Sequence, residues 1–465
     1  MLKWEKLLND GKRKEKNDKK GEDSDTQGVR LEAERDYDRI LFANPTRRLA
    51  DKTQVFPLEV NDSVRTRLTH SHEVSNLARS IGVAISHDYA EEVFGKGHAE
   101  LQVSRKVPSI LAAIGLAHDL GNPPFGHQGE VAMRNWFRSD SCYPEPDNSK
   151  DEQEKIHSDF LNFDGNPQTF RLLTRLQILN DDFGLNLTYG TLAALVKYPW
   201  FSTSDTNKRA HDTKFGVFES ERNVVEDVWQ NTGLSEGVRH PLTYIMEACD
   251  DIAYLVMDAE DTVKKGCASF YDLIAHLKPS NSDPVIDRVI EYSQGKNREF
   301  RGSGSLSASE LNEISMQMFR VISISELIKA ATSTFVSNIE SIMNCEVEAG
   351  FELMEKSSGS ILCESLRSFD RRNGFQDKSV LRLELEGNNY ITSTMDMFWH
   401  AITMSKSPFS TYATAQISEN YRRAKTRSNQ SDYYKNCQLI ADSMAGMTDG
   451  FLILTHNDLN SLYRK

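Results

Sequence analysis

The segment that runs from Gly115 to Glu130 concentrates side chains suited to chemistry. It reads Gly-Leu-Ala-His-Asp-Leu-Gly-Asn-Pro-Pro-Phe-Gly-His-Gln-Gly-Glu, so the pair His118-Asp119 is followed by a Gly/Pro-rich turn that presents His127. A lone His-Asp dipeptide usually has only a structural hydrogen-bonding role. Buried ionisable groups are costly, however, unless they are paired or bind a metal. Several such groups, held by one stiff turn at the end of an apolar helix, therefore favour a metal or catalytic site.

Two histidines upstream, His70 and His72, are candidates to join this site. His70 lies four residues before Val74 and shares its helix face, which belongs to an apolar stripe, whereas His72 does not. Without further context, a pair of surface histidines is the simpler interpretation. The sequence leaves both interpretations open and favours His70 if one of the two points inward.

A third group of polar side chains lies in the segment Met246–Asp261. Asp250, Tyr254 and Asp258 are spaced four residues apart and occupy one face of the predicted helix. That face lies roughly 140° from the apolar stripe that begins at Ile245, at about 100° per residue, so it is compatible with plain solvent surface. A tyrosine between two acids is equally compatible with one wall of a cleft, and the spacing does not decide between them.

Together these segments supply histidine nitrogens and carboxylate oxygens, a ligand set suited to a divalent ion such as Mn²⁺, Mg²⁺ or Zn²⁺. Such an ion lowers the pKa of bound water and neutralises the charge of phosphate oxygens. Arg67, Lys197 and nearby basic residues would contribute positive charge to a pocket in an otherwise acidic protein. The residue types are thus suited to metal-assisted chemistry on a phosphate compound.

The elements that must position these side chains are mainly helical. Apolar residues recur at helical spacing in several segments, which predicts amphipathic helices. The stripes lie at Val74–Ile85, Ile110–Ala117, Ile245–Ala259 and Leu311–Ile328. Ser307–Glu310 is typical of a capping box ahead of the last of these, and the alternating run Val380–Leu385 predicts one short strand. We expect an all-α fold with at most a few short strands.

The chain divides into a short arm and one large domain. Three stretches are predicted as loops: Ser139–Lys155, Phe201–Lys214 and Lys278–Ser305. None resembles a domain linker, and no internal repeat is visible, so residues 36–465 are predicted as one domain with insertions. Residues 1–35 mix basic residues with acids, Gly and Ser, and apolar residues almost vanish after Leu8. We predict a solvated, mobile arm there, with contact to a partner subunit or nucleic acid as the alternative.

Composition excludes several classes of protein. The 465 residues carry a net charge of −13 with 38% hydrophobic and 26% charged residues, typical of a soluble globular chain. No apolar run approaches the ~20 residues that cross a bilayer, and no secretory signal is visible. The 6 cysteines lie far apart without a Cys-x-x-Cys motif, which favours reduced intracellular thiols over a disulfide framework. A pI near 5.5 argues against an extended nucleic-acid-binding surface.

The order of these motifs resembles that of a known family. His70, His118-Asp119 and Asp250 look like the H…HD…D signature of the HD-domain metal phosphohydrolases, and longer strings are similar to the bacterial dGTP triphosphohydrolase (dGTPase) family. The strings are Arg-Arg-Leu from Arg47, Asp-Lys-Thr-Gln-Val-Phe-Pro-Leu-Glu from Asp51, Val-Arg-Thr-Arg-Leu-Thr-His-Ser from Val64, His-Asp-Leu-Gly-Asn-Pro-Pro-Phe-Gly-His from His118, Phe-Asp-Gly-Asn-Pro-Gln from Phe163, Lys-Tyr-Pro from Lys197 and Gly-Met-Thr-Asp from Gly446. They occur in order over nearly the whole chain.

The resemblance implies a role for each matching residue. The metal ligands of the family fall on His70, His118, Asp119 and Asp250. The spacing Asp-x-x-x-Tyr-x-x-x-Asp selects Asp250 over Asp251 for the last of these. The catalytic histidine falls on His127, and its acidic partner falls on Glu130.

Substrate contacts are implied in the same way. On the sugar side they are Tyr254 against the ring, Asp258 near the 3′-hydroxyl and Gln54 beside them. On the phosphate side they are Arg67, Lys197 and Tyr198. Arg422 and its neighbour Arg423 are expected to reach the site of a neighbouring subunit. The resemblance also implies a core HD segment at about residues 60–265 and a helical C-terminal region at about residues 306–465.

The resemblance further implies metal-dependent hydrolysis of deoxynucleoside triphosphates, dGTP above all, to deoxynucleoside and tripolyphosphate. We expect a cytoplasmic homo-oligomer, a hexamer in some family members, with Mn²⁺ or Mg²⁺ as cofactor and with single-stranded DNA or a dNTP effector as further partners. The alternatives are an HD-domain phosphohydrolase of another nucleotide and a nucleotide-sensing or single-stranded-nucleic-acid-binding protein with a secondary hydrolase site. Asn122 and Asp251 depart from the related mammalian dNTP hydrolase, which has histidine and lysine there, so a relay of two histidines in the turn is not expected.

Overall fold

The computed structural model describes the whole chain except residues 15–28, 59–63, 140–156, 178–180, 206–213, 279–282, 303, 305, 376–377, 404–406 and 464–465. Within the described residues the regular structure is helical, and pairing between extended segments is limited to the isolated bridges Lys12–Thr188, Thr53–Thr66 and Phe201–Val217. The predicted all-α fold is confirmed. None of the described helices combines the length and the apolar character needed to cross a membrane.

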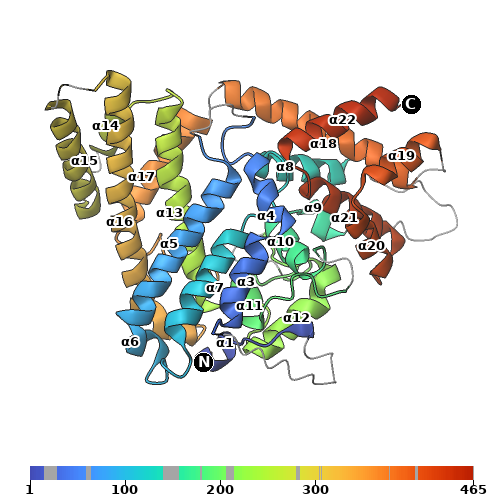
Figure 1. The fold of residues 1–465 in the computed structure, drawn as a ribbon, viewed down its shortest axis with the longest axis horizontal. Coiled ribbons are helices and arrows are strands. Elements are labelled where there is room, and N and C mark those ends of the chain that lie inside the picture. Colours follow the sequence, from blue (N-terminus) through green and yellow to red (C-terminus); the bar gives the residue numbers. More distant parts are fainter. Residues whose placement is uncertain are drawn as a thin grey trace.

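The helices follow one another from the N-terminus, in blue, to the C-terminus, in red (Figure 1). The first half contains α1 (Trp4–Leu7), α3 (Glu32–Leu41), α4 (Asn44–Arg48), η1 (Leu49–Asp51), α5 (Arg67–His87), α6 (Ala90–Phe94), α7 (Val103–Ala117), α8 (Gly126–Arg138), α9 (Ser158–Leu161), α10 (Gly165–Thr174), α11 (Tyr189–Leu195), η4 (Glu219–Glu221) and α12 (Arg222–Thr232). The second half contains α13 (Pro241–Lys264), α14 (Phe270–Leu277), α15 (Pro284–Gly302), α16 (Ala308–Met343), α17 (Ser360–Asp370), η6 (Arg371–Phe375), α18 (Lys378–Thr403), α19 (Pro408–Gln416), α20 (Glu419–Arg427), α21 (Asp432–Ala445) and α22 (Asp449–Leu462).

The core around the candidate site is built from α5, α7 and α13, which pack against one another, and α16 lies alongside α13 (Figure 1). The stripe of α5 that was predicted to be apolar, from Val74 to Ile85, is buried there. A Cβ atom on Gly115 of α7 would lie 2.8 Å from the Cα atom of Ser75 in α5. Only glycine therefore allows the two helices to approach so closely.

A second apolar core joins distant parts of the chain. Phe137 of α8 and Phe160 of α9 belong to the same buried cluster as Phe398 of α18 and Ile440 of α21. Because α8 packs against α18 and α13 packs against α16, the predicted core segment and the predicted C-terminal region share their interiors. The two regions are therefore not independent units of packing.

Two local predictions are wrong. Val380–Leu385 lies inside α18 and is helical, and Leu381 and Leu385 are 49% and 62% exposed, so their alternation was not a pattern of burial. The predicted loop Lys278–Ser305 contains α15, which starts at an Asp-Pro pair. The Asp283 side chain accepts hydrogen bonds from the amides of Val285 and Ile286 at 2.9 and 3.0 Å, which caps the helix. A proline in the first turn of a helix is favourable, and the pair is a start signal.

The predicted capping box and the other two predicted loops can also be compared with the structure. The Ser307–Glu310 capping box is confirmed, since the Ser307 amide donates to the Glu310 carboxylate at 2.8 Å and the Ser307 hydroxyl accepts from the Glu310 amide at 3.3 Å. The described ends of the predicted loops at Ser139 and at Phe201–Asp205 are not helical. The interiors of these two loops, residues 140–156 and 206–213, lie outside the described residues.

The predicted mobile arm is wrong for residues 1–14, which pack on the body of the protein. Trp4, Leu7 and Leu8 are buried, and the Trp4 indole donates to the Val93 carbonyl at 2.8 Å. The next residues continue along the surface of α11, where the Tyr189 amide donates to the Gly11 carbonyl at 2.9 Å. A few apolar residues at the start of a basic segment are thus enough to anchor it. Residues 15–28 of the predicted arm lie outside the described residues.

Candidate metal centre

Three helices bring the predicted metal ligands together. His70 lies in the first turn of α5, the pair His118-Asp119 follows α7, and Asp250 lies in the middle of α13. Ligand atoms of His70, His118 and Asp119 lie within 4.8 Å of one another. The Asp250 Oδ1 atom lies 3.1 Å from His70 Nε2 and 3.3 Å from His118 Nε2. Residues far apart in the sequence thus converge, as the resemblance implied.

His118 is oriented as a metal ligand would be. Its Nδ1 atom lies 2.7 Å from the Gly115 carbonyl and donates to it, which leaves the Nε2 lone pair directed into the cluster. That Nε2 atom is buried and makes no hydrogen bond within the described residues. Burial opposes protonation of His118, but the Asp119 and Asp250 carboxylates outweigh burial and raise its pKa to about 9. A cluster this rich in carboxylate attracts positive charge, and a divalent ion would supply it in place of the proton.

Asp119 is held from two sides. Arg67 forms an ion pair with one carboxylate oxygen, and the Asn122 amide donates to the other at 2.7 Å. Burial alone would raise the pKa of Asp119, but the charges of Arg67 and His118 outweigh it and hold that pKa below its usual value. Arg67 is itself buried and fixed by the Thr53 carbonyl, 3.1 Å from Nε and 2.9 Å from Nη2. The cluster therefore has the supporting hydrogen bonds typical of metal sites.

The turn after Asp119 is locked onto α10. A Cβ atom on Gly121 would lie 2.3 Å from both the Gly165 carbonyl oxygen and the Thr169 amide nitrogen, so glycine is required at this contact. The Thr169 hydroxyl accepts from the Gly121 amide at 2.9 Å and donates to the His118 carbonyl at 3.2 Å. The string Phe163–Gln168 is thus explained as the support of the turn, a role that spacing alone did not reveal.

His127 and Glu130 form a hydrogen-bonded pair beside this turn. The His127 Nδ1 atom lies 3.1 Å from Glu130 Oε2, while Glu130 Oε1 accepts from the Gly165 amide at 2.8 Å. The Glu130 side chain is 8% exposed, whereas that of His127 is 69% exposed. A buried carboxylate therefore orients an imidazole whose other nitrogen remains accessible to a substrate.

A C-terminal clamp was missed by sequence reasoning. The Asp449 carboxylate accepts from the amides of Thr53 and Phe125, both at 3.0 Å. The Lys52 ammonium donates to the carbonyls of Asn122 and Ala445 at 2.6 and 2.7 Å. Burial, followed by repulsion from nearby Arg67, lowers the pKa of Lys52 to about 7. The signal was present in the string Gly446-Met-Thr-Asp449, which ends on the clamp residue.

The predicted phosphate-side residues lie beside α13. Lys197 Nζ is 3.4 Å from a Glu247 oxygen, and 5.7 Å from the centre of the Tyr198 ring. Burial lowers the pKa of Lys197, but Glu247 and other acids of α13, including Asp250, outweigh it, so the pKa is raised well above its usual value. Glu247 also binds Arg239 at 2.9 Å. Glu247 is a second residue that the sequence analysis did not single out.

Two of the predicted sugar-side residues, Tyr254 and Asp258, lie near the buried acid Asp370 and form an acidic wall with it. Asp258 is 3% exposed, which contradicts the solvent-surface interpretation for that residue. Its Oδ2 atom, both carboxylate oxygens of Asp370 and the Gln54 carbonyl oxygen are buried without a hydrogen-bond partner among the described residues. Burial, with the neighbouring Asp370 charge, raises the pKa of Asp258 well above its usual value. Unsatisfied buried acceptors of this kind are rare and fit the hydroxyl groups of a ligand.

Known proteins are similar to this chain over nearly its whole length. The HD domain family matches residues 67–160, which include His70, His118 and Asp119. A deoxyguanosinetriphosphate triphosphohydrolase-like protein of Listeria monocytogenes is 35% identical over 99% of this chain and 100% of its own length. A protein of Pseudomonas aeruginosa with the same description is 32% identical over 90% of each chain. The deoxyguanosinetriphosphate triphosphohydrolase of Salmonella arizonae is 30% identical over 91% of this chain and 93% of its own.

This chain belongs to the deoxyguanosinetriphosphate triphosphohydrolase family. The family is one of hydrolases, and the two histidines and the aspartate in the matched HD domain form the cluster that could hold a metal ion. Asn122 and Asp251, the two residues that differ from the related mammalian dNTP hydrolase, can now be placed in the structure. Asn122 supports Asp119 in this chain. Burial, with Asp250 and Glu247 nearby, raises the pKa of Asp251 to about 7.

Arg422 is not brought to the cluster. It lies in α20, and within the described residues no hydrogen bond or ion pair joins its side chain to the candidate metal ligands. Its Nε atom is buried without a hydrogen-bond partner among those residues. Contact between Arg422 and a neighbouring subunit's site remains a prediction.

Proposed function

We propose that this protein hydrolyses deoxynucleoside triphosphates, dGTP in particular, to the deoxynucleoside and tripolyphosphate with the help of Mn²⁺ or Mg²⁺. The observation that carries the proposal is the buried His118 Nε2 atom, which makes no hydrogen bond among the described residues and lies in a cluster of histidines and carboxylates. The accessible His127 imidazole, held by Glu130, follows on the next helix. The family to which the chain belongs supports this choice of reaction.

The metal would be held by His70, His118, Asp119 and Asp250. When bound, a divalent ion lowers the pKa of coordinated water and neutralises phosphate charge. Arg67, fixed by the Thr53 carbonyl, would bind and orient the phosphate chain. Lys197 would add a second positive charge for the phosphates, because its raised pKa keeps it cationic.

The proton would be handled by His127. Water adds to the α-phosphorus and the bond to the 5′-oxygen breaks, so one proton must reach the departing oxygen. Glu130 accepts the hydrogen of Nδ1 and orients the ring, which leaves Nε2–H of the protonated imidazole to donate that proton. General acid catalysis of this kind typically contributes about 10²- to 10⁴-fold.

The sugar would bind against Tyr254 and the acidic wall. Asp258 and Gln54 offer buried acceptors that a 3′-hydroxyl can satisfy. Tyr254 lies one turn before Asp258 on α13 and would close the site against a 2′-hydroxyl, since a ribose would place an extra polar group against the ring. Deoxynucleotides are therefore expected to be preferred over ribonucleotides.

A substrate panel tests the proposal. The protein is incubated with each of the four dNTPs and with GTP in the presence of Mn²⁺, and the phosphate products are separated by ion-exchange chromatography. We expect tripolyphosphate from dGTP and little turnover of GTP. Pyrophosphate or single phosphate as the product, or equal turnover of GTP, would overturn this mechanism.

The cellular location and the remaining partners stay predictions. The predicted location is the cytoplasm, and the predicted partners are further copies of the chain in a homo-oligomer such as a hexamer, single-stranded DNA and a dNTP effector. Two charges in the described part of the basic arm are engaged within the chain and do not favour the DNA alternative. Lys12 is paired with Glu32, and Lys14 lies 3.2 Å from an Asp181 oxygen.

A further inference from the structure

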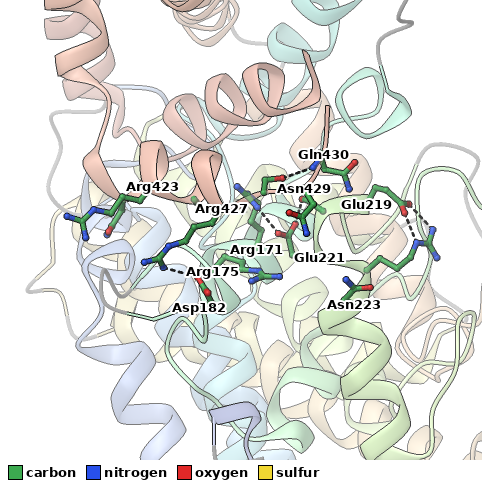
Figure 2. A pocket seen from close by; sticks show the side chains of 15 residues that line it. Arg171, Arg175, Asp182, Glu219, Glu221, Asn223, Arg423, Arg427, Asn429 and Gln430 are labelled. Carbon is green, nitrogen blue, oxygen red and sulfur yellow. Dashed lines mark hydrogen bonds and ion pairs between the residues drawn. The ribbon is translucent and has the colours of Figure 1, made fainter. Parts of the chain in front are cut away.

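A cavity lined by arginines lies apart from the candidate metal centre. It has a volume of ≈ 220 Å³ and is enclosed by α10, by η4 with the start of α12, and by α20 with the loop that follows it. Its arginines are Arg171, Arg175, Arg222, Arg423 and Arg427. Figure 2 shows the side chains of α20, in salmon, approaching those of the green segments across this space. None of the lining residues is a predicted metal ligand, and only Arg423 among them was expected to reach a site, that of a neighbouring subunit.

The cavity carries more positive than negative charge. Each acid in its wall is already paired with an arginine: Glu221 with Arg171 at 2.6 Å, Glu219 with Arg222 at 2.6 Å and Asp182 with Arg427 at 2.8 Å. Arg171 also binds Asp442, which lies outside the wall, at 2.8 Å. Among the lining residues themselves, Arg175 and Arg423 are in excess, in a chain of net charge −13. The pair that Arg423 forms with Glu419, outside the wall, is largely exposed and therefore weak. A concave positive surface of this kind attracts anions.

Arg175 is the side chain that most directly indicates a ligand. It is partly buried, and its guanidinium has no hydrogen bond or ion pair within the described residues. Its neighbour is another cation, Arg13, which donates to the Thr174 carbonyl at 3.1 Å. Burial and repulsion by Arg175 lower the pKa of Arg13 to about 10. Arg13 and Arg175 are thus neighbouring cations, and Arg175 has no carboxylate partner among the described residues. This arrangement is unfavourable unless an anion binds between the two guanidinium groups.

The donors of the cavity suit phosphate. Guanidinium groups match two phosphate oxygens at once and bind them more strongly than neutral donors do. Asn420, Asn429 and Gln430 add side-chain amides to the same wall. We propose that this cavity is a second, metal-independent binding site for an oligophosphate chain, carried by free tripolyphosphate or by a nucleoside triphosphate. Binding there requires neither the metal centre nor hydrolysis, so this proposal and the proposed function can fail separately.

The site is connected to the metal centre through α10. Arg171 lies near the C-terminal end of this helix, and Arg175 is its C-cap residue. At the N-terminal end the Gly165 amide donates to Glu130, and in the middle of the helix the Thr169 hydroxyl donates to the carbonyl of His118. Because one helix of 10 residues makes both sets of contacts, an anion that fixes its C-terminal end also restrains the turn that carries His118 and His127. Occupation of the cavity is therefore expected to protect that turn.

Binding is tested by titrating tripolyphosphate into the full-length protein in EDTA by calorimetry. We expect one site, and we expect R175Q and R427Q each to weaken binding about tenfold, the loss typical of one charge-assisted contact. R382Q is the matched control, because it removes the same charge from an arginine in α18 whose side chain is 80% exposed. Equal affinity in the wild type and in the R175Q/R427Q double variant would overturn the proposal.

Competition and hydrogen exchange distinguish the ligand and the connection. In EDTA, dGTP should compete with tripolyphosphate and deoxyguanosine should not, since the phosphate chain is what is recognised. Displacement of tripolyphosphate by oligothymidylate at lower concentration than by dGTP would instead assign the cavity to nucleic acid. Tripolyphosphate should slow amide exchange across residues 118–130 in the wild type and in R382Q. Equal protection in R175Q would show that the effect does not pass through α10.

Discussion

At the scale of single residues, the metal centre depends on which nitrogen or oxygen each side chain leaves available. His118 uses Nδ1 on the Gly115 carbonyl and keeps Nε2 for the cluster. His127 uses Nδ1 on Glu130 and keeps Nε2 for the substrate. Both histidines therefore use Nδ1 for a hydrogen bond within the protein and leave Nε2 for another partner, but their surroundings differ. One is buried among carboxylates and the other is exposed beside them.

The H127A variant separates these roles. Its kcat for dGTP is expected to fall about 10²- to 10⁴-fold, since the proton donor is lost. Its affinity for Mn²⁺, measured by calorimetry, should remain that of the wild type, because His127 lies outside the ligand set. H87A, at the exposed end of α5, is the matched control and should keep full activity. Undiminished turnover in H127A would contradict the mechanism.

At the scale of elements, the site depends on how closely two helices approach. The first turn of α5 carries Arg67 and His70, and the end of α7 carries His118, so any separation of these helices pulls the ligands apart. Their close approach is possible because Gly115 of α7 lies against the backbone of α5 at Ser75. The helix pair is therefore sensitive to a single added methyl group.

A matched pair of glycine substitutions tests this contact. In G115A the new Cβ atom would meet backbone at 2.8 Å, so we expect a loss of about 1–3 kcal/mol in unfolding free energy and weaker Mn²⁺ binding. In G295A of α15 nothing lies within 4 Å of the new atom, so we expect a gain of about 0.5–1 kcal/mol. Both are measured by denaturant unfolding and calorimetry. Normal Mn²⁺ binding in G115A would contradict the argument.

The N-terminal helix gives a second prediction at this scale. The His240 Nδ1 atom accepts from the Leu242 amide at 3.1 Å and Nε2 donates to the Leu7 carbonyl at 3.2 Å, so the buried ring is neutral. Burial lowers its pKa to about 4, from 6.5 in the unfolded chain. Its contribution to stability is therefore complete above pH 6.5 and is lost as the pH falls towards 4.

We expect the segment around α1 to detach in this acidic range before the rest of the protein unfolds. The emission of Trp4, obtained as the difference between the wild type and W4F, should shift to longer wavelength between pH 6 and 4.5 and recover on neutralisation. The H240Q variant, which does not gain a charge, should show a weaker pH dependence. Trp4 emission that changes only with global unfolding would exclude this local release.

At the scale of the whole molecule, the C-terminal region completes a site that the N-terminal half supplies. Asp449, near the end of the chain, connects Thr53, which holds Arg67, to Phe125 in the catalytic turn. Lys52 makes a parallel connection between Asn122 and Ala445. The second apolar core, which joins α8 to α18 and α21, keeps these partners in place.

The D449A variant tests the clamp. It leaves two backbone amides without acceptors, so we expect lower kcat and weaker Mn²⁺ binding, each by about 10- to 100-fold, as for other outer partners of metal ligands. D458A, whose exposed carboxylate accepts from Tyr412 at 2.9 Å, is the control and should retain activity. Normal activity in D449A, with the fold intact by circular dichroism, would contradict a positioning role.

The sequence by itself determined the helical fold class and the candidate ligands, because both are recorded in local patterns. Helical periodicity marked α5, α7, α13 and α16, and the motif strings marked His70, His118, Asp119 and Asp250. Local patterns also misled where their partners were distant. The alternation at Val380–Leu385 falls in a helix with exposed leucines, and the basic N-terminus is anchored by Trp4.

Only the tertiary structure decided which polar residues meet. The face of α13 that carries Asp258 was open to two interpretations, and packing against other helices buried that residue. The clamp by Asp449 and the cavity of arginines depend on contacts between residues hundreds of positions apart. Hydrogen bonds and charge pairs act over a few ångströms of space, and a sequence records neighbours along the chain. The chemistry could therefore be expected from the residues, but its assembly required the fold.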